Sequence, residues 1–366
     1  MRRSVWLLMS MAVVLLGCAT PRLAAIPPGA TVDLPVDHGP HDDAQTEWWH
    51  VHADLRDVAT GEEVHVFAGF VVERTELDRV AGLKIAPLVD PYHVAYVQVV
   101  TERGASTVGR ANFPLGHARF DGEALDLRQG PWRVAFEDGV AILRAGTGLQ
   151  RIELRMEATR PATLPGGGEA VEIVPGTRHH WYQQEGMKAS GSWRDRGRLR
   201  TVEGTAFFKH QWGRLYHPDV QGFEWFSFDL PGGRTVVLVK VHSAGLRDGP
   251  GSLGFVSEGG TPRELDARAV RVDRVDRWRS PRSGASWPVR WRLQQADGTD
   301  LEVAALHRDQ ELTVFPAAFY AGPARVVGTF AGEPVDTIGF VEHVGGWAPP
   351  LRFLYRSDPP PEEASR

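Results

Sequence analysis

Short segments whose side chains alternate between apolar and polar, separated by turns rich in glycine and proline, run through nearly the whole chain. The 366 residues include 40 glycines and 26 prolines, and no long segment after the first thirty or so residues has the apolar spacing of a helix. In residues 151–159, Ile152, Leu154 and Met156 alternate strictly with charged side chains. That alternation is typical of an antiparallel strand with one buried face. The sequence therefore predicts an all-β protein.

The same alternation places strands in both halves of the chain. The predicted strands are residues 47–52, 63–72, 93–101, 132–137, 140–144, 151–159, 186–194, 199–212, 223–230, 234–242, 287–293, 301–305, 324–330 and 337–343. A chain of this length suits two domains, which we place at residues 33–216 and 217–347. Two meanders of similar length would suit two barrels of about eight strands each, and a barrel of that size can hold one apolar ligand.

The first residues are typical of a targeting segment. Two arginines precede an apolar core that is too short to cross a bilayer, and Leu-Leu-Gly-Cys then ends at Cys18. This run is similar to the cleavage box of bacterial lipoproteins, so we predict a signal peptide in residues 1–18, a lipid on Cys18 and a tether in residues 19–32. An anchor in the outer membrane, facing the periplasm, is our expectation. The alternative is an ordinary secretory signal with an incidental cysteine.

Composition bears on three further properties, namely disulfides, nucleic-acid partners and disorder. Cys18 is the only cysteine, so the mature chain has no internal disulfide. A net charge of −5 with mixed signs gives no reason to expect a nucleic-acid partner. The tail at residues 348–366 is rich in proline and is predicted to be disordered.

Residues 204–213 (G-T-A-F-F-K-H-Q-W-G) hold the densest mixture of aromatic, basic and amide side chains. In a strand, Phe207, Lys209 and Gln211 would share one face, and His210 and Trp212 the other. Each buried polar group without a partner costs roughly 1–3 kcal/mol. The stretch therefore predicts either a pocket wall or a strand with one wet face.

Residues 47–52 (E-W-W-H-V-H) predict a second polar strand, with Trp49 on the face of Glu47 and with His50 and His52 on the opposite face. Glu47 beside two tryptophans is a candidate buried acid with a raised pKa, able to donate a proton. The alternative is a carboxylate paired with an arginine or lysine that joins two strands.

These patterns supply the candidate site residues. The candidate catalytic groups are Glu47, His179, Lys209 and His210. The candidate ligand-binding residues are Trp48, Trp49, Trp181, Phe207, Gln211, Trp212, Trp225 and Glu342. The alternatives are that Lys209 forms an ion pair with Glu47 or Glu342, that the histidines are satisfied within the core, and that the tryptophans are ordinary barrel core.

No cofactor and no metal is predicted. A zinc site stays open as an alternative, because it needs three or four converging ligands and the sequence does not reveal convergence. The nitrogens available for such a site belong to His41, His50, His52, His179, His180 and His210.

Six short motifs, in this order, resemble those of the family that groups carotenoid 1,2-hydratase (hydroxyneurosporene synthase) with AttH-like secreted proteins. They are His41-Asp42-Asp43 before Glu47-Trp48-Trp49, His179-x-Trp181, residues 204–213, residues 222–226 (G-F-E-W-F), residues 278–284 (W-R-S-P-R-S-G) and Phe340-Val341-Glu342. The resemblance covers residues from about 38 to about 345. It implies two consecutive lipocalin-like antiparallel β-barrels with a hydrophobic ligand near their junction.

The resemblance also implies a chemistry from which this sequence departs. In the hydratase branch, an acid protonates a terminal isoprenoid double bond and water captures the cation; related fungal proteins are linked to cyclisation of polyenes. The positions that match the hydratase's tyrosine and aspartate are Phe207 and Lys209, and Gln211 stands where AttH-type chains have glutamate. His50 replaces the tyrosine expected after E-W-W. The acid of the family mechanism is therefore missing from this face.

Two functions follow as hypotheses. The first is a lipoprotein that binds a lipid, isoprenoid or polyketide-like ligand. The second is a hydratase, isomerase or cyclase acting on an apolar polyene through Glu47, His179, Lys209 or His210. A purely structural envelope protein is the third possibility.

Overall fold

The computed structural model describes residues 26–74, 91–112, 118–120, 125–214, 220, 222–242, 248–314 and 317–345. The predicted signal peptide with Cys18 and the predicted tail at residues 348–366 lie outside the described residues. No helix in the described part of the chain combines the length and the apolar character that a membrane span needs.

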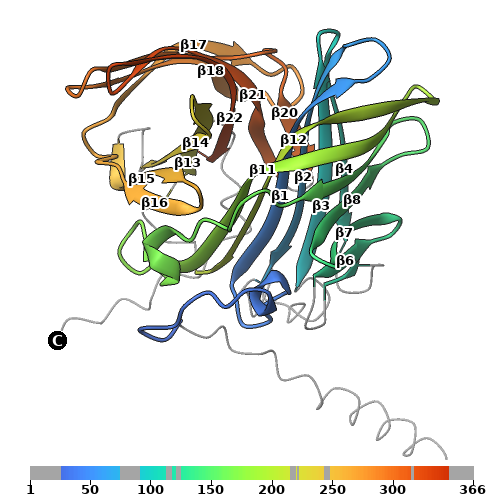
Figure 1. The fold of residues 1–366 in the computed structure, drawn as a ribbon, viewed down its shortest axis with the longest axis horizontal. Helices are drawn as coiled ribbons and strands as arrows, with labels where there is room; N and C mark the ends of the chain where they lie inside the picture. Colours follow the sequence, from blue (N-terminus) through green and yellow to red (C-terminus); the bar gives the residue numbers. More distant parts are fainter. Residues whose placement is uncertain are drawn as a thin grey trace, which may run out of the picture.

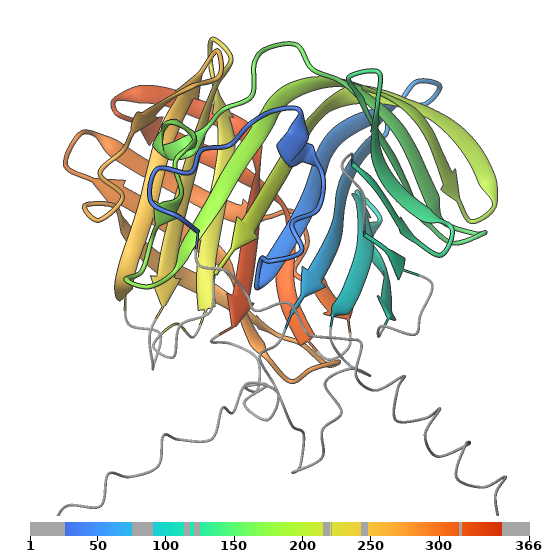
Figure 2. The same cartoon turned by 90° about the horizontal axis from the view of Figure 1, so that it is seen from below.

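Two large antiparallel sheets curl side by side and form the molecule, as Figures 1 and 2 show from two directions. The described chain contains only two short 3-10 helices, η1 (Val36–His38) and η2 (Pro165–Gly168). This architecture confirms the predicted all-β class and the two lipocalin-like β-barrels.

The first sheet has twelve strands in the described residues, in the order β4-β3-β2-β1-β12-β11-β9-β8-β7-β6-β5, with β10 beside β11. Its strands are β1 (Thr46–Asp57), β2 (Glu63–Glu73), β3 (Tyr92–Thr101), β4 (Gly104–Asn112), β5 (Ala118–Arg119), β6 (Asp126–Gln129), β7 (Trp132–Glu137), β8 (Val140–Gly146), β9 (Arg151–Glu157), β10 (Val171–Glu172), β11 (Arg178–Asp195) and β12 (Arg198–Gly213).

The second sheet has ten strands in the described residues, in the order β16-β15-β14-β13-β22-β21-β19-β18-β17, with β20 beside β21. Its strands are β13 (Gly222–Leu230), β14 (Arg234–His242), β15 (Asp248–Glu258), β16 (Thr261–Glu264), β17 (Arg271–Arg279), β18 (Ser286–Gln295), β19 (Thr299–Ala305), β20 (Glu311–Val314), β21 (Ala317–Phe330) and β22 (Glu333–Gly345).

The prediction of about eight strands per barrel is wrong for both sheets. One reason is a bulge in β11, where the pairing with β12 shifts between Gln184 and Met187. Gly186 lies in this bulge with φ +57°, which glycine adopts at little cost. The bulge divides β11 into a part that pairs with β10 and a part that pairs with β9. The sequence prediction also missed β4, β5, β6, β10, β15, β16, β17 and β20.

Each sheet encloses its own apolar core, and two smaller clusters join the sheets. The larger cores contain Trp49 and Phe208 in the first sheet and Trp287 and Trp291 in the second. One joining cluster consists of Phe67, Tyr96, Leu312, Ala321 and Phe340. The other contains Trp181, Trp225, Val237, Val239 and Phe255. We call the space between the two sheets, where these two clusters lie, the junction.

Two segments before β1 and after β9 close one end of the first sheet. Val32 donates its backbone N–H to Gly168 at 2.9 Å, and Thr31 forms a bridge with Glu169. The last residues of the predicted tether are therefore bound to the fold. Residues 33–45 contain η1, which places the Asp37 carbonyl beside His210 near the end of β12.

Candidate functional site

The pairing of β1 with β12 sorts the candidate residues onto two faces of one sheet. Trp49 lies opposite His210, and His50 lies opposite Lys209. The face with Trp49 and His210 points into the first barrel, because both belong with its buried residues. The face with His50 and Lys209 points to the junction. This division confirms the face assignment made from alternation.

On the inner face, a buried carboxylate is held by two imidazoles. The Glu47 Oε1 atom lies 2.9 Å from His210 Nε2 and 2.7 Å from His41 Nδ1. The His41 backbone N–H also donates to Glu47 Oε2 at 2.9 Å. Asp37 completes the cluster, because its Oδ1 atom lies 3.3 Å from His41 Nε2. Glu47 and His210 are completely buried, so this cluster is closed to solvent on one side.

The prediction that Glu47 has a raised pKa is wrong. Burial raises the pKa of Glu47, but the hydrogen bonds from His210 and His41 outweigh burial and lower it. Burial lowers the pKa of His41, whereas its bonds to Asp37 and Glu47 raise it to about 9. The inner cluster therefore holds an ionised carboxylate beside a charged imidazole, and Glu47 is not a proton donor at neutral pH.

On the junction face, Lys209 forms an ion pair with an acid from the other sheet. Lys209 Nζ lies 3.0 Å from Glu342 Oε1, and His52 Nε2 lies 3.1 Å from the same oxygen. His50 Nδ1 is 3.6 Å from it. The side chains of Lys209 and Glu342 are only 1% and 3% exposed. Of the two partners left open for Lys209, the structure selects Glu342, because Glu47 lies on the opposite face.

A tyrosine that sequence reasoning missed extends this cluster. Tyr96 Oη lies 2.7 Å from His50 Nε2, although β2 separates their strands. Gly69 stands between them in the same cross-strand row. A Cβ atom at Gly69 would lie only 2.3 Å from Tyr96 Cζ. The absence of a side chain at residue 69 is therefore what allows the ring to cross β2.

The charges of the junction face follow from burial and pairing. Burial raises the pKa of Glu342, but Lys209 and the neighbouring histidines outweigh it and hold the pKa well below its ordinary value. Burial lowers the pKa of Lys209 against the opposing effect of Glu342. Burial also lowers the pKa of His50 to about 4. This face therefore holds one ionised pair flanked by a neutral imidazole.

Aromatic rings surround the ion pair. Lys209 Nζ lies 3.7 Å from the ring centroid of Trp225, which favours the charged ammonium. The rings of Trp181 and Trp225 are 4.8 Å apart. Phe340 stacks on His52 with ring centroids 3.7 Å apart, and the ring of Phe207 is 5.3 Å from that of His52. The wall of the junction is thus largely aromatic.

Two indole donors in this wall have no acceptor. Trp181 and Trp225 are 1% and 2% exposed. Within the described part of the chain, neither indole N–H has a hydrogen-bond partner. A buried donor without a partner costs roughly 1–3 kcal/mol and calls for an explanation.

The remaining predicted residues divide between the faces. Trp212 stacks on His41 on the inner face, with ring centroids 4.2 Å apart. Trp48 donates to Gln211 Oε1 at 2.8 Å on the junction face. His179 is buried two residues before Trp181, on the same side of β11. The four candidate catalytic residues therefore do not form one site, since Glu47 and His210 are separated from Lys209 by the sheet itself.

Among the described residues, two trios have the convergence that a metal site needs. They are His41, Glu47 and His210 on the inner face, and His50, His52 and Glu342 at the junction. The inner trio offers two imidazole nitrogens and a carboxylate oxygen, a donor set that zinc accepts. In the junction trio, the ammonium of Lys209 already binds the same carboxylate oxygen, and its charge opposes a cation.

The predicted loop motif at residues 278–284 surrounds a buried carboxylate of β20. Ser280 and Ser283 both donate to Glu311, and Trp287 Nε1 donates to Glu311 Oε1 at 2.7 Å. Glu311 directly precedes Leu312, a member of the joining cluster. The motif thus fixes the position of β20 against the junction.

Comparison with known proteins places the chain in a family. The sequence profile of the AttH-like family matches residues 25–345. The chain belongs to the AttH-like family. None of the curated proteins compared with it matches.

Solved structures of similar fold extend over most of the chain. An AttH protein of Nitrosomonas europaea has a TM-score of 0.77 at 22% identity, covering 89% of this chain and 100% of its own. Kievitone hydratase of Nectria haematococca has a TM-score of 0.69 at 14% identity, covering 89% and 97%. CghA has a TM-score of 0.52 at 13% identity, covering 89% and 96%. At these identities, the likeness shows the shared fold.

Proposed function

We propose that this AttH-like protein binds an apolar molecule, of the lipid, isoprenoid or polyketide class, at the junction of its two barrels. The observation that carries the proposal is the pair of unpartnered indole donors, Trp181 and Trp225, in a wall of aromatic rings. A ligand with one oxygen acceptor would satisfy a donor while its apolar part covers the rings. Because both indoles are almost fully buried, binding requires the facing side chains to move apart.

Native mass spectrometry of the protein isolated from its own host tests this proposal directly, since a co-purifying apolar molecule is expected. In vitro, the uncharged probe N-phenylnaphthylamine should bind to the purified chain with increased fluorescence. Trp225→Phe keeps the ring and removes the donor, so it should weaken binding of an oxygen-bearing ligand more than binding of the probe. Trp278→Phe, in the second barrel, is the control. Equal effects of the two variants on the natural ligand would contradict the proposal.

An enzymatic function is the second candidate, favoured by the chain of contacts from Tyr96 through His50 and Glu342 to Lys209. In this role, the Lys209 ammonium, made more acidic by burial, protonates a double bond and becomes a neutral amine. Water then adds to the cation and loses its proton to the pair formed by Glu342 and His52. The proton returns to Lys209 over 3.0 Å.

Turnover of a polyene by the purified protein, lost in a Lys209→Met variant that is still folded, would support this candidate. Glu47→Gln is the informative control, because Glu47 lies on the opposite face of the sheet. If Glu47→Gln abolishes turnover in a folded protein while Lys209→Met retains it, the proton does not come from the junction.

We also propose that the chain is a lipoprotein attached to the envelope through Cys18, because of the Leu-Leu-Gly-Cys run. The acyl chains of a lipidated cysteine supply the apolar carbons that stable anchoring needs. Wild-type protein should incorporate labelled palmitate and sediment with membranes. Cys18→Ser should do neither; a variant that still incorporates the label would contradict the assignment.

A further inference from the structure

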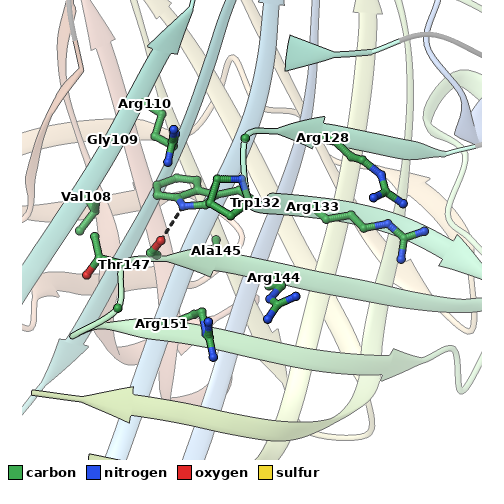
Figure 3. A pocket seen from close by; sticks show the side chains of 14 residues that line it. Val108, Gly109, Arg110, Arg128, Trp132, Arg133, Arg144, Ala145, Thr147 and Arg151 are labelled. Carbon is green, nitrogen blue, oxygen red and sulfur yellow. Dashed lines mark hydrogen bonds between the residues drawn. The ribbon is translucent and has the colours of Figure 1, made fainter. Parts of the chain in front are cut away.

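A pocket lined by arginines lies where the edge strand β4 meets the ends of β6, β7, β8 and β9 (Figure 3). Its volume is about 860 Å³. The arginines that line it are Arg110, Arg128, Arg133, Arg144 and Arg151. None of the junction residues is part of this lining, so the pocket is independent of the proposed function.

The strand register explains how the arginines come together. Arg119 lies opposite Arg128, Arg128 opposite Arg133, and Arg133 opposite Arg144. Four neighbouring strands thus carry arginine at four successive positions of one cross-strand row. Like charges directly opposite one another destabilise a sheet. The fold does not require this row, because outward positions of a strand accept any polar residue.

Acidic neighbours offset only part of this charge. Asp126 binds Arg128 and Arg133, and Glu153 binds Arg144 and Arg151. Glu137 adds a further bond to Arg133. The five lining arginines therefore meet three carboxylates, in a protein whose net charge is −5. The pocket is a local positive site on an acidic molecule.

Arg110 contributes a guanidinium without an acidic partner among the described residues. It lies over the ring of Trp132, 5.9 Å from the centroid. A Cβ atom at Gly130 would come within 2.9 Å of its terminal nitrogen, so the glycine leaves room for it. Trp132 is itself fixed by a hydrogen bond of 2.6 Å to the Gly146 carbonyl. The guanidinium therefore lies over an indole ring that is held in place by its own hydrogen bond, with Val108 beside it (Figure 3).

We propose that this pocket binds a phosphate-bearing small molecule or lipid headgroup. Adjacent arginines of the row are spaced as directly opposed residues are, about 4.5–5.5 Å between Cβ atoms, so two guanidinium forks can converge on one phosphate. Arginine also matches the geometry of phosphate oxygens better than lysine does. A volume of about 860 Å³ is larger than one phosphate needs, and Val108, which also lines the pocket, supplies apolar contact for the rest of the ligand.

Isothermal titration of the purified full-length chain tests the proposal with two probes. Sodium pyrophosphate represents a free phosphate, and dihexanoyl phosphatidylglycerol represents a lipid headgroup. At least one should bind saturably and release heat that falls as salt is added, since the contacts are ionic. Tighter binding of pyrophosphate assigns the pocket to a soluble phosphate; tighter binding of the lipid assigns it to a headgroup.

The test variant and the control variant each remove two positive charges. Arg133→Ser/Arg144→Ser should weaken binding by about tenfold or more, because charge-assisted hydrogen bonds are lost. The control, Arg292→Ser/Arg325→Ser, removes two exposed arginines from the second barrel and should leave binding unchanged. If the first variant fails to fold, Arg110→Ser takes its place, since it breaks no ion pair among the described residues. Absence of saturable binding by both probes, or equal weakening in test and control variants, overturns the proposal.

Discussion

Replacing Lys209 by methionine should destabilise the protein strongly. The side chains of Lys209 and Glu342 are almost fully buried, and their charged atoms are 3.0 Å apart. Methionine fills a similar volume but leaves the Glu342 carboxylate without its cation. Removing one partner of a buried pair costs about 3–5 kcal/mol, because an uncompensated charge stays in the interior. Since a typical protein has only about 5–15 kcal/mol of stability, this loss is a large fraction of the whole.

The loss in Lys209→Met should depend on pH, because His52 can take over part of the lysine's role. Its Nε2 atom is 3.1 Å from the same carboxylate oxygen, and burial now lowers the pKa of His52. Without the ammonium, Glu342 should raise the pKa of His52 above its present value. Relative to wild type, the folded variant then binds more protons on His52, so its loss of stability becomes smaller as pH falls. Lys209→Met should therefore be closer to wild type at pH 6 than at pH 8.

Urea unfolding followed by tryptophan fluorescence measures these differences, and the double variant Lys209→Met/Glu342→Gln isolates the pair. The double variant should lose less free energy of unfolding than the sum of the two single variants, by about 0.5–3 kcal/mol. As a control, Arg325→Met breaks an exposed pair with Asp336 and should cost less than about 1 kcal/mol. Strict additivity, or a Lys209→Met loss as small as that of the control, would refute the reasoning.

Two further outcomes concern the pH profile of the inner cluster and the packing of Tyr96 at the junction. Because its bonds to two carboxylates raise the pKa of His41 from 6.5 to about 9, the stability that it contributes is complete below pH 6.5 and disappears as pH rises through 9; His41→Gln should flatten this part of the profile in thermal unfolding. Gly69→Ala should displace the Tyr96 ring and cost about 1–3 kcal/mol, whereas Gly148→Ala, whose Cβ atom would meet nothing within 4 Å, should be nearly neutral. A neutral Gly69→Ala would mean that the ring adapts without cost.

Alternation along residues 47–52 and 204–213 was sufficient to assign the two faces, because the side-chain period of a strand is fixed at two. It did not identify the partner of Lys209. That choice depends on which strand of the second sheet approaches β12, and Glu342 is separated from Lys209 by 133 positions along the chain. The contact between Tyr96 and His50 was also hidden, since it depends on register and on the missing side chain of Gly69.

The pKa of Glu47 shows a second limit of prediction from sequence. The motif E-W-W predicted an acid among aromatic rings, and Trp49 is indeed stacked against His210 on that face, 4.6 Å away. The bonds that His210 and His41 make to Glu47 outweigh the effect of its burial. His210 is placed by the pairing of β12 with β1, and His41 by the loop that follows η1. The row of arginines could not be predicted because the four residues become neighbours only through the register of four strands.

The residue at position 209 determines whether the buried junction holds a proton shared between two carboxyls or an ion pair. By the resemblance to the hydratases, aspartate is expected at this position. An aspartate so near Glu342 would make two buried carboxyls share one proton, which could be donated to a substrate. With lysine, no hydrogen is shared between two carboxyls, and the ammonium balances the charge of the Glu342 carboxylate. Exchanging Lys209 for aspartate would thus change the protonation of its neighbour across the sheets, so these two positions are expected to vary together wherever such chains diverge.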